Sequence, residues 1–207
     1  MKANNLNFYF ITDSRLSRNG NVSDVKAAVS AGAWIVQYRE KNLSPQAMIE
    51  EARELKKICD GRTIFLINDR VDVCLAVDAD GVHLGQGDMD LAIAQSLLSS
   101  KIIGVTVHNE EEAVTAQKGG AAYVGVSPIY STFTKDDAGD ACGTEIIERI
   151  RKIIRIPIVA IGGITKLNTP DVIKAGADSV AAISATVALD DVKKEVEEFN
   201  RIIRKNK

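Results

Sequence analysis

Residues 31–41 read AGAWIVQYREK, and this stretch decides the fold that the sequence predicts. Its second residue is Gly32, and glycine often ends helices by adopting a left-handed conformation. The apolar run 33–36 follows, as expected for a buried β-strand, and the strand then closes on an amide, two cations and an acid. A helix end, a buried strand and a polar strand end, in this order, make one unit of an alternating β/α fold.

The same unit recurs along the chain. Similar helix-to-strand joints occupy residues 119–123 and 175–180, and residues 76–82 fill the same slot. Strand-like runs, most of them near-continuously apolar, cover residues 8–12, 34–39, 63–68, 80–84, 101–107, 121–126, 157–162 and 178–184. Helical patterns lie between them and are clearest at 44–61, 143–155 and 190–205. Repeated units of this type predict a single compact (β/α)₈ TIM barrel spanning residues 1–207, with an open doubly wound sheet as the alternative.

Size and composition narrow the class of protein. A chain of 207 residues with 45% apolar content suits one large α/β domain. A net charge of -2 does not indicate nucleic acid or an anionic membrane as a partner. No apolar run is long enough to span a bilayer, the N-terminus does not read as a signal peptide, and the three cysteines lack metal-type spacing. We therefore expect a cytoplasmic protein with reduced thiols and small-molecule partners.

Polar side chains gather where the predicted strands end, which is where a barrel of this type carries its chemistry. The period of two along a strand places Gln37, Arg39 and Lys41 on one side and Tyr38 and Glu40 on the other. A guanidinium and an ammonium in one patch suit a polyanion, although both residues also fit ordinary surface charges. For Glu40 we expect a structural ion pair.

Two aspartates follow adjacent strands. Asp69 and Asp88 follow the ends of the third and fourth predicted strands, which are adjacent, so their carboxylates are expected to converge. Two carboxylates beside a phosphate-rich ligand are the usual means of holding Mg²⁺. The alternative is that each caps the helix that follows it, and one residue can both cap and ligate.

A second anion site is predicted on other strands. Gly162 and Gly163 follow the seventh strand, and residues 183–184 follow the eighth, where this fold often binds phosphate through backbone N–H groups. The long loop 127–143 adds two hydroxyls and a cation, from Thr132, Thr134 and Lys135. The alternative is a plain glycine turn beside a solvated loop. Two anion sites in one barrel mouth indicate two phosphorylated substrates, or one substrate with two phosphorylated ends.

With these residues assembled, the sequence resembles the thiamine phosphate synthase family over essentially its whole length. The resemblance is carried by QYREK (37–41), IND (67–69), HLGQGD (83–88), GVTVHN (104–109), YVGVSPIYSTFTK (123–135), GGI (162–164) and ISA (183–185). It implies a Mg²⁺-assisted transferase that joins hydroxymethylpyrimidine diphosphate to hydroxyethylthiazole phosphate and releases pyrophosphate. The family's reaction is thought to be dissociative and to need no strong general base.

The resemblance also implies roles for individual residues. Asp69 and Asp88 would bind Mg²⁺, and Thr106 would contact the pyrimidine. The substrate-binding set comprises Gln37, Tyr38, Arg39, Glu40, Lys41, Asn68, Thr106, Thr132, Thr134, Lys135, Gly163, Ile183 and Ser184. Within it, the residues expected to act in catalysis are Arg39, Lys41, Thr106 and Lys135.

Two other functions are compatible with a barrel of this kind. A thiazole tautomerase would isomerise a thiazole carboxylate phosphate, but it would not need the cations at 39 and 41 together with both aspartates. A non-catalytic barrel that only binds phosphorylated ligands is the other alternative, but it would have no evident need for both the two cations and the two aspartates. A homo-oligomer is compatible with the sequence, although the apolar stripe of the C-terminal helix (Val192, Val196, Phe199 and Ile203) is expected to pack on the barrel.

Overall fold

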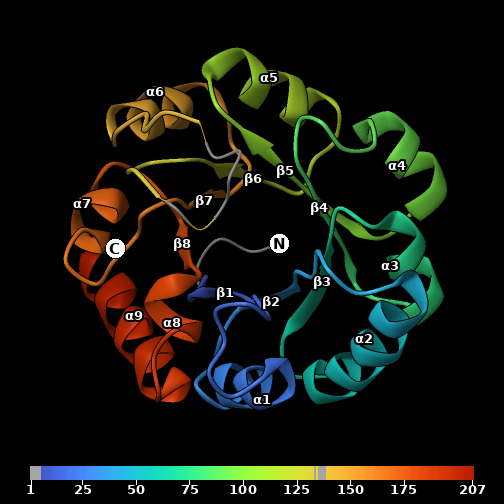
Figure 1. Cartoon of the computed structure of the whole chain (residues 1–207). Coiled ribbons are helices and arrows are strands. Elements are labelled where there is room, and N and C mark those ends of the chain that lie inside the picture. Colours follow the sequence, from blue (N-terminus) through green and yellow to red (C-terminus); the bar gives the residue numbers. More distant parts are fainter. Residues whose placement is uncertain (1–5, 133, 135–138) are drawn as a thin grey trace.

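The computed structural model describes residues 6–132, 134 and 139–207. Its parallel strands form one closed barrel in sequence order, because β1 pairs with both β2 and β8. Viewed down the axis, the strands form an inner ring and the helices an outer one (Figure 1). The prediction of a (β/α)₈ barrel is therefore confirmed, and the open sheet is excluded by the pairing of the first and last strands.

Each predicted strand is present, shortened by up to two residues at either end. The strands are β1 (Tyr9–Ile11), β2 (Ile35–Tyr38), β3 (Ile64–Asn68), β4 (Gly81–Leu84), β5 (Ile102–Val107), β6 (Tyr123–Val126), β7 (Ile158–Ala160) and β8 (Ser179–Ala182). The helices are α1 (Asn21–Ser30), α2 (Pro45–Cys59), α3 (Val71–Val77), α4 (Leu91–Leu98), α5 (Glu110–Lys118), α6 (Glu145–Ile153), α7 (Thr169–Lys174), α8 (Ser184–Val187) and α9 (Val192–Asn206).

The joints between helices and strands have the backbone conformation that their sequence predicts. Gly32 and Gly176 lie in the left-handed region, with φ of 78° and 109°. Asp78 takes the same role after α3 with φ of 54°, and an aspartate tolerates this region better than most residues. Each joint ends its helix and turns the chain into the next strand.

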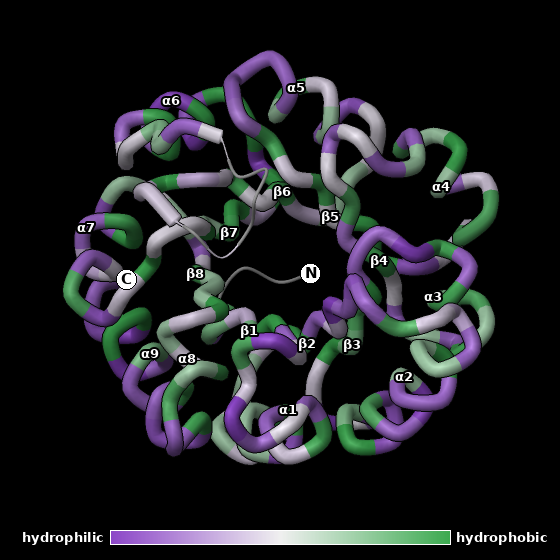
Figure 2. Tube along the Cα trace, in the orientation of Figure 1, coloured by the Kyte–Doolittle hydropathy of each residue, from purple (hydrophilic) through white to green (hydrophobic). Residues whose placement is uncertain are grey.

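The core lies between the strands and the surrounding helices. Figure 2 shows hydrophobic colour along the strands and alternating colours on the helices, as amphipathic helices on a buried sheet require. The predicted stripe of α9 is buried, and the ring of Phe199 stacks on that of Phe8 at 4.6 Å. The C-terminal helix therefore packs on the barrel, as expected.

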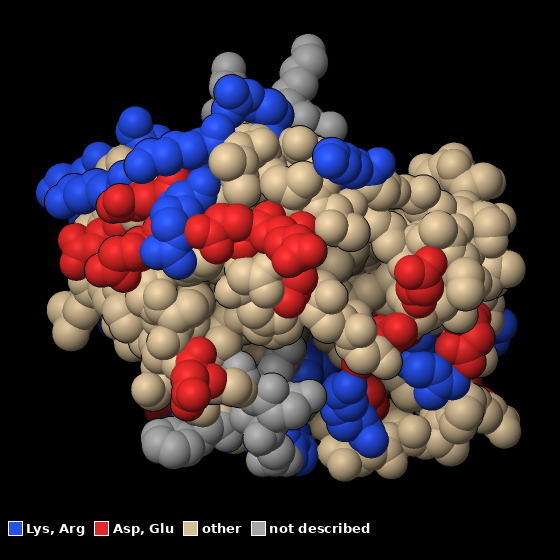
Figure 3. All heavy atoms as spheres, turned by 90° about the horizontal axis from the view of Figure 1, so that it is seen from above, with Lys and Arg blue, Asp and Glu red and all other residues tan. Residues whose placement is uncertain are grey.

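The surface carries both signs of charge. On the face shown in Figure 3, basic and acidic side chains lie close together, in keeping with the net charge of -2. Among the described residues, no helix is long and apolar enough to cross a membrane. Cys59, Cys74 and Cys142 are all free thiols.

Candidate active site

The alternation predicted for the end of β2 is present. Arg39 and Lys41 line a cavity of about 430 Å³ at the carboxyl ends of the strands, and Gln37 lines a smaller one deeper in the barrel. Tyr38 points the opposite way, and its hydroxyl donates to Glu51 on α2 at 2.5 Å. The structure thus separates Tyr38 from the cavity, although the sequence had predicted it in the substrate-binding set.

Glu40 also lies outside the cavity. Its carboxylate accepts the backbone N–H groups of Lys41 at 2.8 Å and of Asn42 at 2.6 Å. Burial acts to raise the pKa of Glu40, but hydrogen bonds from Ser14 and from these N–H groups lower it overall. Glu40 forms none of the ion pairs found among the described residues, so the ion pair expected for it is not present there. Its carboxylate instead holds the β2–α2 loop by accepting backbone N–H groups.

Arg39 is held by a buried carboxylate that the sequence analysis did not select. Its Nη1 donates to Asp13 at 2.6 Å, and the side chains are only 8% and 1% exposed. The backbone of Arg39 is fixed as well, because its N–H donates to the Thr12 hydroxyl at 2.9 Å. The buried Nε of Arg39 has no hydrogen-bond partner among the described residues, and Arg39 also lines the larger cavity.

Asp13 could have been found from the sequence. It follows the first strand closely, as Asp69 follows the third, so it too is a polar side chain at the carboxyl end of a strand. What the pattern could not show is that its carboxylate lies against Arg39.

The two aspartates converge, and neither caps a helix. The cap of α3 is Arg70 and that of α4 is Asp90, whose side chain accepts the N–H groups of Ala92 and Ile93. The carboxyl groups of Asp69 and Asp88 lie close enough to shift each other's pKa, and Lys41 forms an ion pair with Asp69. The capping alternatives are therefore wrong, and both carboxylates face the cavity.

The charges fit a cation site, and the local backbone is compatible with it. Asp69 has φ of 62°, a left-handed conformation that aspartate tolerates better than most residues and that Asp78 also adopts. Burial and the neighbouring Asp69 raise the pKa of Asp88; burial alone would also raise the pKa of Asp69, but hydrogen bonds from Asp88 and Lys41 lower it. Two carboxylates that compete for one proton also present oxygen ligands to a hard cation. No cluster of three or more His, Cys, Asp or Glu side chains that could hold a metal occurs among the described residues.

The remaining wall of the cavity comes from the neighbouring strands. It is formed by Asn68, His83, Gly85, Gln86, Gly87, Thr106, His108 and Ser127. Thr106 and His83 are hydrogen-bonded to each other at 2.9 Å, between Oγ1 and Nε2. Asn68 and Thr106 thus lie where the sequence analysis expected them, on the same cavity as the cations and the aspartates.

A separate pocket, which we call the smaller pocket, lies on the side of β7 and β8 and is distinct from the deeper cavity lined by Gln37. Its volume is about 40 Å³, and its lining includes Thr132, Thr134, Gly162, Gly163, Ile183 and Ser184. Gly162 and Gly163 have φ of 95° and 61°, and a Cβ on Gly163 would lie 2.6 Å from the carbonyl oxygen of Ser131. The glycines are therefore required both by the backbone and by the close approach of the loop. Lys135, which was predicted to join this region, lies outside the described residues.

Comparison with known proteins adds independent information. A family model described as thiamine monophosphate synthase matches residues 8–186. A thiamine-phosphate synthase of Methanosarcina mazei is 58% identical over 98% of this chain and 85% of its own length. One from Chloroflexus aurantiacus is 50% identical over 89% of this chain and 86% of its own length. The solved structure of thiamine phosphate pyrophosphorylase from Pyrococcus furiosus superposes with a TM-score of 0.91 at 40% identity, covering 98% of both chains.

Proposed function

This chain belongs to the thiamine monophosphate synthase family, and from that premise we propose which groups of the barrel mouth carry the reaction. It is a transferase with thiamine-phosphate synthase activity. We propose that its substrates are hydroxymethylpyrimidine diphosphate and hydroxyethylthiazole phosphate. The products are then thiamine phosphate and pyrophosphate.

The observation that carries this proposal is the pairing of two unlike anion pockets in one mouth. The larger cavity combines Arg39, Lys41 and the two aspartates, which suits a diphosphate and a cation. The smaller pocket offers backbone and hydroxyl groups, which suit a single phosphate. Ser127 lines both pockets, so the reacting ends of two substrates bound in this way would meet beside it.

In the proposed reaction the bond between the pyrimidine methylene carbon and the diphosphate oxygen breaks, and its electron pair leaves with pyrophosphate. The thiazole nitrogen then donates its lone pair to the methylene carbon, forming the new C–N bond. Arg39 and Lys41, which both line the larger cavity, would bind the negative charge that develops on the leaving group. Asp69 and Asp88 are the residues that would hold Mg²⁺, whose chemical contribution would be Lewis-acid stabilisation of the leaving group. Neither step requires a general base.

The decisive experiment is an assay of the purified protein with Mg²⁺ and both substrates. We expect pyrophosphate and thiamine phosphate to form in equal amounts. Omitting the thiazole phosphate should abolish thiamine phosphate formation. Isomerisation of a thiazole carboxylate phosphate without any product from the pyrimidine diphosphate would instead identify the chain as a tautomerase.

A further inference from the structure

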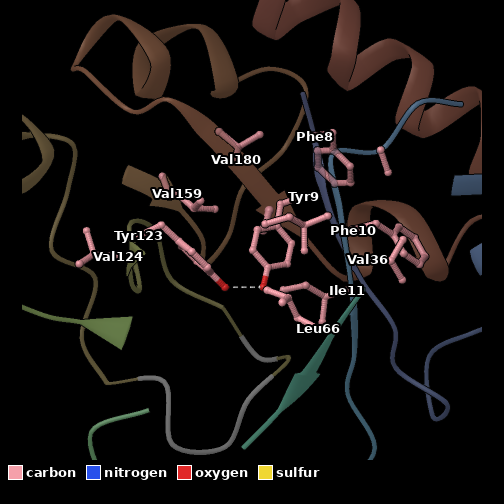
Figure 4. Packing of buried hydrophobic residues seen from close by; sticks show 14 of the residues in the cluster. Phe8, Tyr9, Phe10, Ile11, Val36, Leu66, Tyr123, Val124, Val159 and Val180 are labelled. Carbon is pink, nitrogen blue, oxygen red and sulfur yellow. Dashed lines mark hydrogen bonds between the residues drawn. The ribbon is translucent and has the colours of Figure 1, made fainter. Parts of the chain in front are cut away.

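Five side chains from five different strands form a continuous hydrogen-bonded chain that lines the deeper cavity and reaches the larger one at His83 and Thr106. Gln37 Nε2 donates to the Tyr9 hydroxyl at 2.6 Å, and the hydroxyls of Tyr9 and Tyr123 lie 2.7 Å apart (Figure 4). The Tyr123 hydroxyl contacts His83 Nδ1 at 2.8 Å, and His83 Nε2 contacts Thr106 Oγ1 at 2.9 Å. We call these five residues the interior chain. Its two ends, Gln37 and Thr106, are the predicted substrate contacts.

The number of protons available to the side chains decides which group donates in each hydrogen bond of the interior chain. Each hydroxyl has one proton to donate, and Tyr9 already accepts from the Gln37 amide. The Tyr9 proton then serves the Tyr123 oxygen, and the Tyr123 proton serves His83 Nδ1. A neutral imidazole that accepts at Nδ1 carries its proton on Nε2 and donates it to Thr106 Oγ1. Every other assignment of these bonds leaves a tyrosine proton without an acceptor in the interior chain.

Burial makes this direction stable. Tyr9 and Tyr123 are only 2% and 0% exposed, and burial raises the pKa of both phenols. Both hydroxyls therefore keep their protons throughout the pH range in which proteins work. A buried polar group without a partner costs free energy, so the fully satisfied arrangement is strongly preferred.

Two glycines make room for the rings of the interior chain. A Cβ on Gly104 would lie 2.0 Å from Cζ of Tyr123, and a Cβ on Gly125 would lie 3.0 Å from Cε1 of His83. Neither glycine has a positive φ, so the backbone does not require glycine at these positions. The close approach of the two rings does.

We propose that Tyr9, Tyr123 and His83 are positioning residues that hold His83 in its Nε2–H tautomer and leave the Thr106 proton free for the cavity, so that Thr106 donates to an accepting ring nitrogen of the pyrimidine substrate. This orients the ring before the diphosphate leaves. The identity of the ring rests on the proposed function, whereas the tautomer of His83 is a property of the protein alone.

The first test reads the tautomer directly in the ligand-free protein. The chain contains only two histidines, so ¹⁵N NMR of the imidazoles can be assigned with a His108→Gln variant. We expect His83 to show a protonated Nε2 and an unprotonated Nδ1. The Tyr123→Phe variant removes the donor to Nδ1 and should shift His83 toward a mixture of tautomers. A protonated Nδ1 in the wild type, or no change in Tyr123→Phe, would overturn the proposal.

The second test examines the ring nitrogen. Binding is measured calorimetrically with the pyrimidine diphosphate and with its two pyridine analogues, each of which has one ring nitrogen replaced by C–H. In the wild type, we expect one analogue to bind about five- to tenfold more weakly than the parent ligand, which is the size of one hydrogen bond. In Thr106→Val, the same analogue and the parent ligand should bind with equal affinity, because the hydrogen bond is already lost. Tyr123→Phe should weaken binding of the parent ligand while leaving KM for the thiazole phosphate unchanged.

A matched control separates positioning from general damage to the barrel. Ser179→Ala also removes a buried hydroxyl bond, to the Asn7 carbonyl, but at the opposite end of the barrel. It should leave both ligand affinities unchanged. If the wild type loses no affinity for either pyridine analogue, Thr106 does not donate to the ring. If the protein makes no thiamine phosphate at all, the proposed function fails, and the NMR result still decides the interior chain.

Discussion

Arg39 enters the barrel mouth already paired with Asp13, and this pair shows how the site is held before any ligand binds. A buried guanidinium without a counterion would face a large desolvation cost. Asp13 offsets that cost at one Nη, while the Nε has no partner among the described residues. The side chain is thus oriented in advance, and binding an anion does not require it to become ordered.

Neutralising Asp13 should therefore damage both stability and binding. We expect Asp13→Asn to lower the free energy of unfolding by about 3 kcal/mol, because it leaves a buried charge uncompensated. KM for the pyrimidine diphosphate should rise because Arg39 loses its orientation. Urea unfolding and steady-state kinetics measure the two effects.

The control for this prediction is an exposed ion pair. Arg18 and Asp190 lie 2.8 Å apart, with side chains 58% and 88% exposed. Asp190→Asn should change stability by less than about 1 kcal/mol. Equal losses in the two variants would contradict the role given to Asp13.

Tyr38 tests the other side of the same strand. Because its hydroxyl bonds Glu51 behind the barrel wall, Tyr38→Phe should leave KM for both substrates unchanged. The lost hydrogen bond should still reduce stability by about 1 kcal/mol. A clear rise in KM for either substrate would return Tyr38 to the binding set that the sequence predicted.

At the scale of elements, the barrel depends on one close approach between β4 and β5. A Cβ on Gly81 would lie 1.8 Å from the Ile102 carbonyl oxygen and 2.6 Å from its carbon. Both atoms belong to the backbone of the neighbouring strand, so no side chain can move aside. The two strands are paired in register at this point.

We therefore expect Gly81→Ala to destabilise the protein by about 3 kcal/mol or more, since relief of the clash must shift a paired strand. Gly87→Ala is the matched control, because nothing lies within 4 Å of the position that its new methyl group would occupy and its φ is not positive. Urea unfolding should show a change below about 1 kcal/mol for the control. If the urea unfolding midpoints of Gly81→Ala and Gly87→Ala were similar, β4 and β5 could move apart at little cost.

The strands and the joints were predictable because each depends on local pattern, whereas only the pairing of β1 with β8 decided between a closed barrel and an open sheet. Apolar runs and helix-ending residues such as Gly32 and Asp78 specify where an element starts and stops, and repetition indicates the ring. The polar rim followed from the period of two. The contacts between strands did not follow, because Asp13 and Arg39 are 26 residues apart and no local pattern pairs them.

Helix caps show the same limit at closer range. Both Asp69 and Asp88 precede a helix, and composition alone cannot distinguish a cap from a residue just before one. In the structure, α3 begins directly after Arg70 and α4 directly after Asp90, so both caps lie closer to their helices than the two aspartates do. The interior chain was missed for a related reason, since a tyrosine inside an apolar strand reads as core.

At the scale of the whole molecule, the two pockets are built on different parts of the ring. The larger cavity draws its charged groups from the ends of β2, β3 and β4, whereas the smaller one uses the ends of β7 and β8. Pyrophosphate and a single phosphate should therefore bind independently. Only the first should depend on a divalent cation.

We predict that Mg²⁺ and pyrophosphate together raise Tm, and that either one alone has a much smaller effect. At a ligand concentration of about 100 Kd, the stabilisation should approach about 2.7 kcal/mol. Asp88→Asn should remove most of the Mg²⁺-dependent part, whereas the shift caused by inorganic phosphate alone should persist. Differential scanning fluorimetry measures all of these shifts. Full Mg²⁺-dependent stabilisation in Asp88→Asn would argue against the two aspartates as the cation site.

The same cation site should lose affinity on acidification earlier than an ordinary pair of carboxylates. Because burial and Asp69 raise the pKa of Asp88, this carboxyl takes up a proton first as the pH falls. A protonated carboxyl is a poor ligand for Mg²⁺, so the shift produced by Mg²⁺ and pyrophosphate should shrink from a pH above the usual aspartate range. Asp69 has a lowered pKa and stays ionised to lower pH, so the residual affinity should disappear in a second step. A Mg²⁺-dependent shift that is constant until both carboxyls titrate together at the ordinary aspartate value would contradict the raised pKa of Asp88.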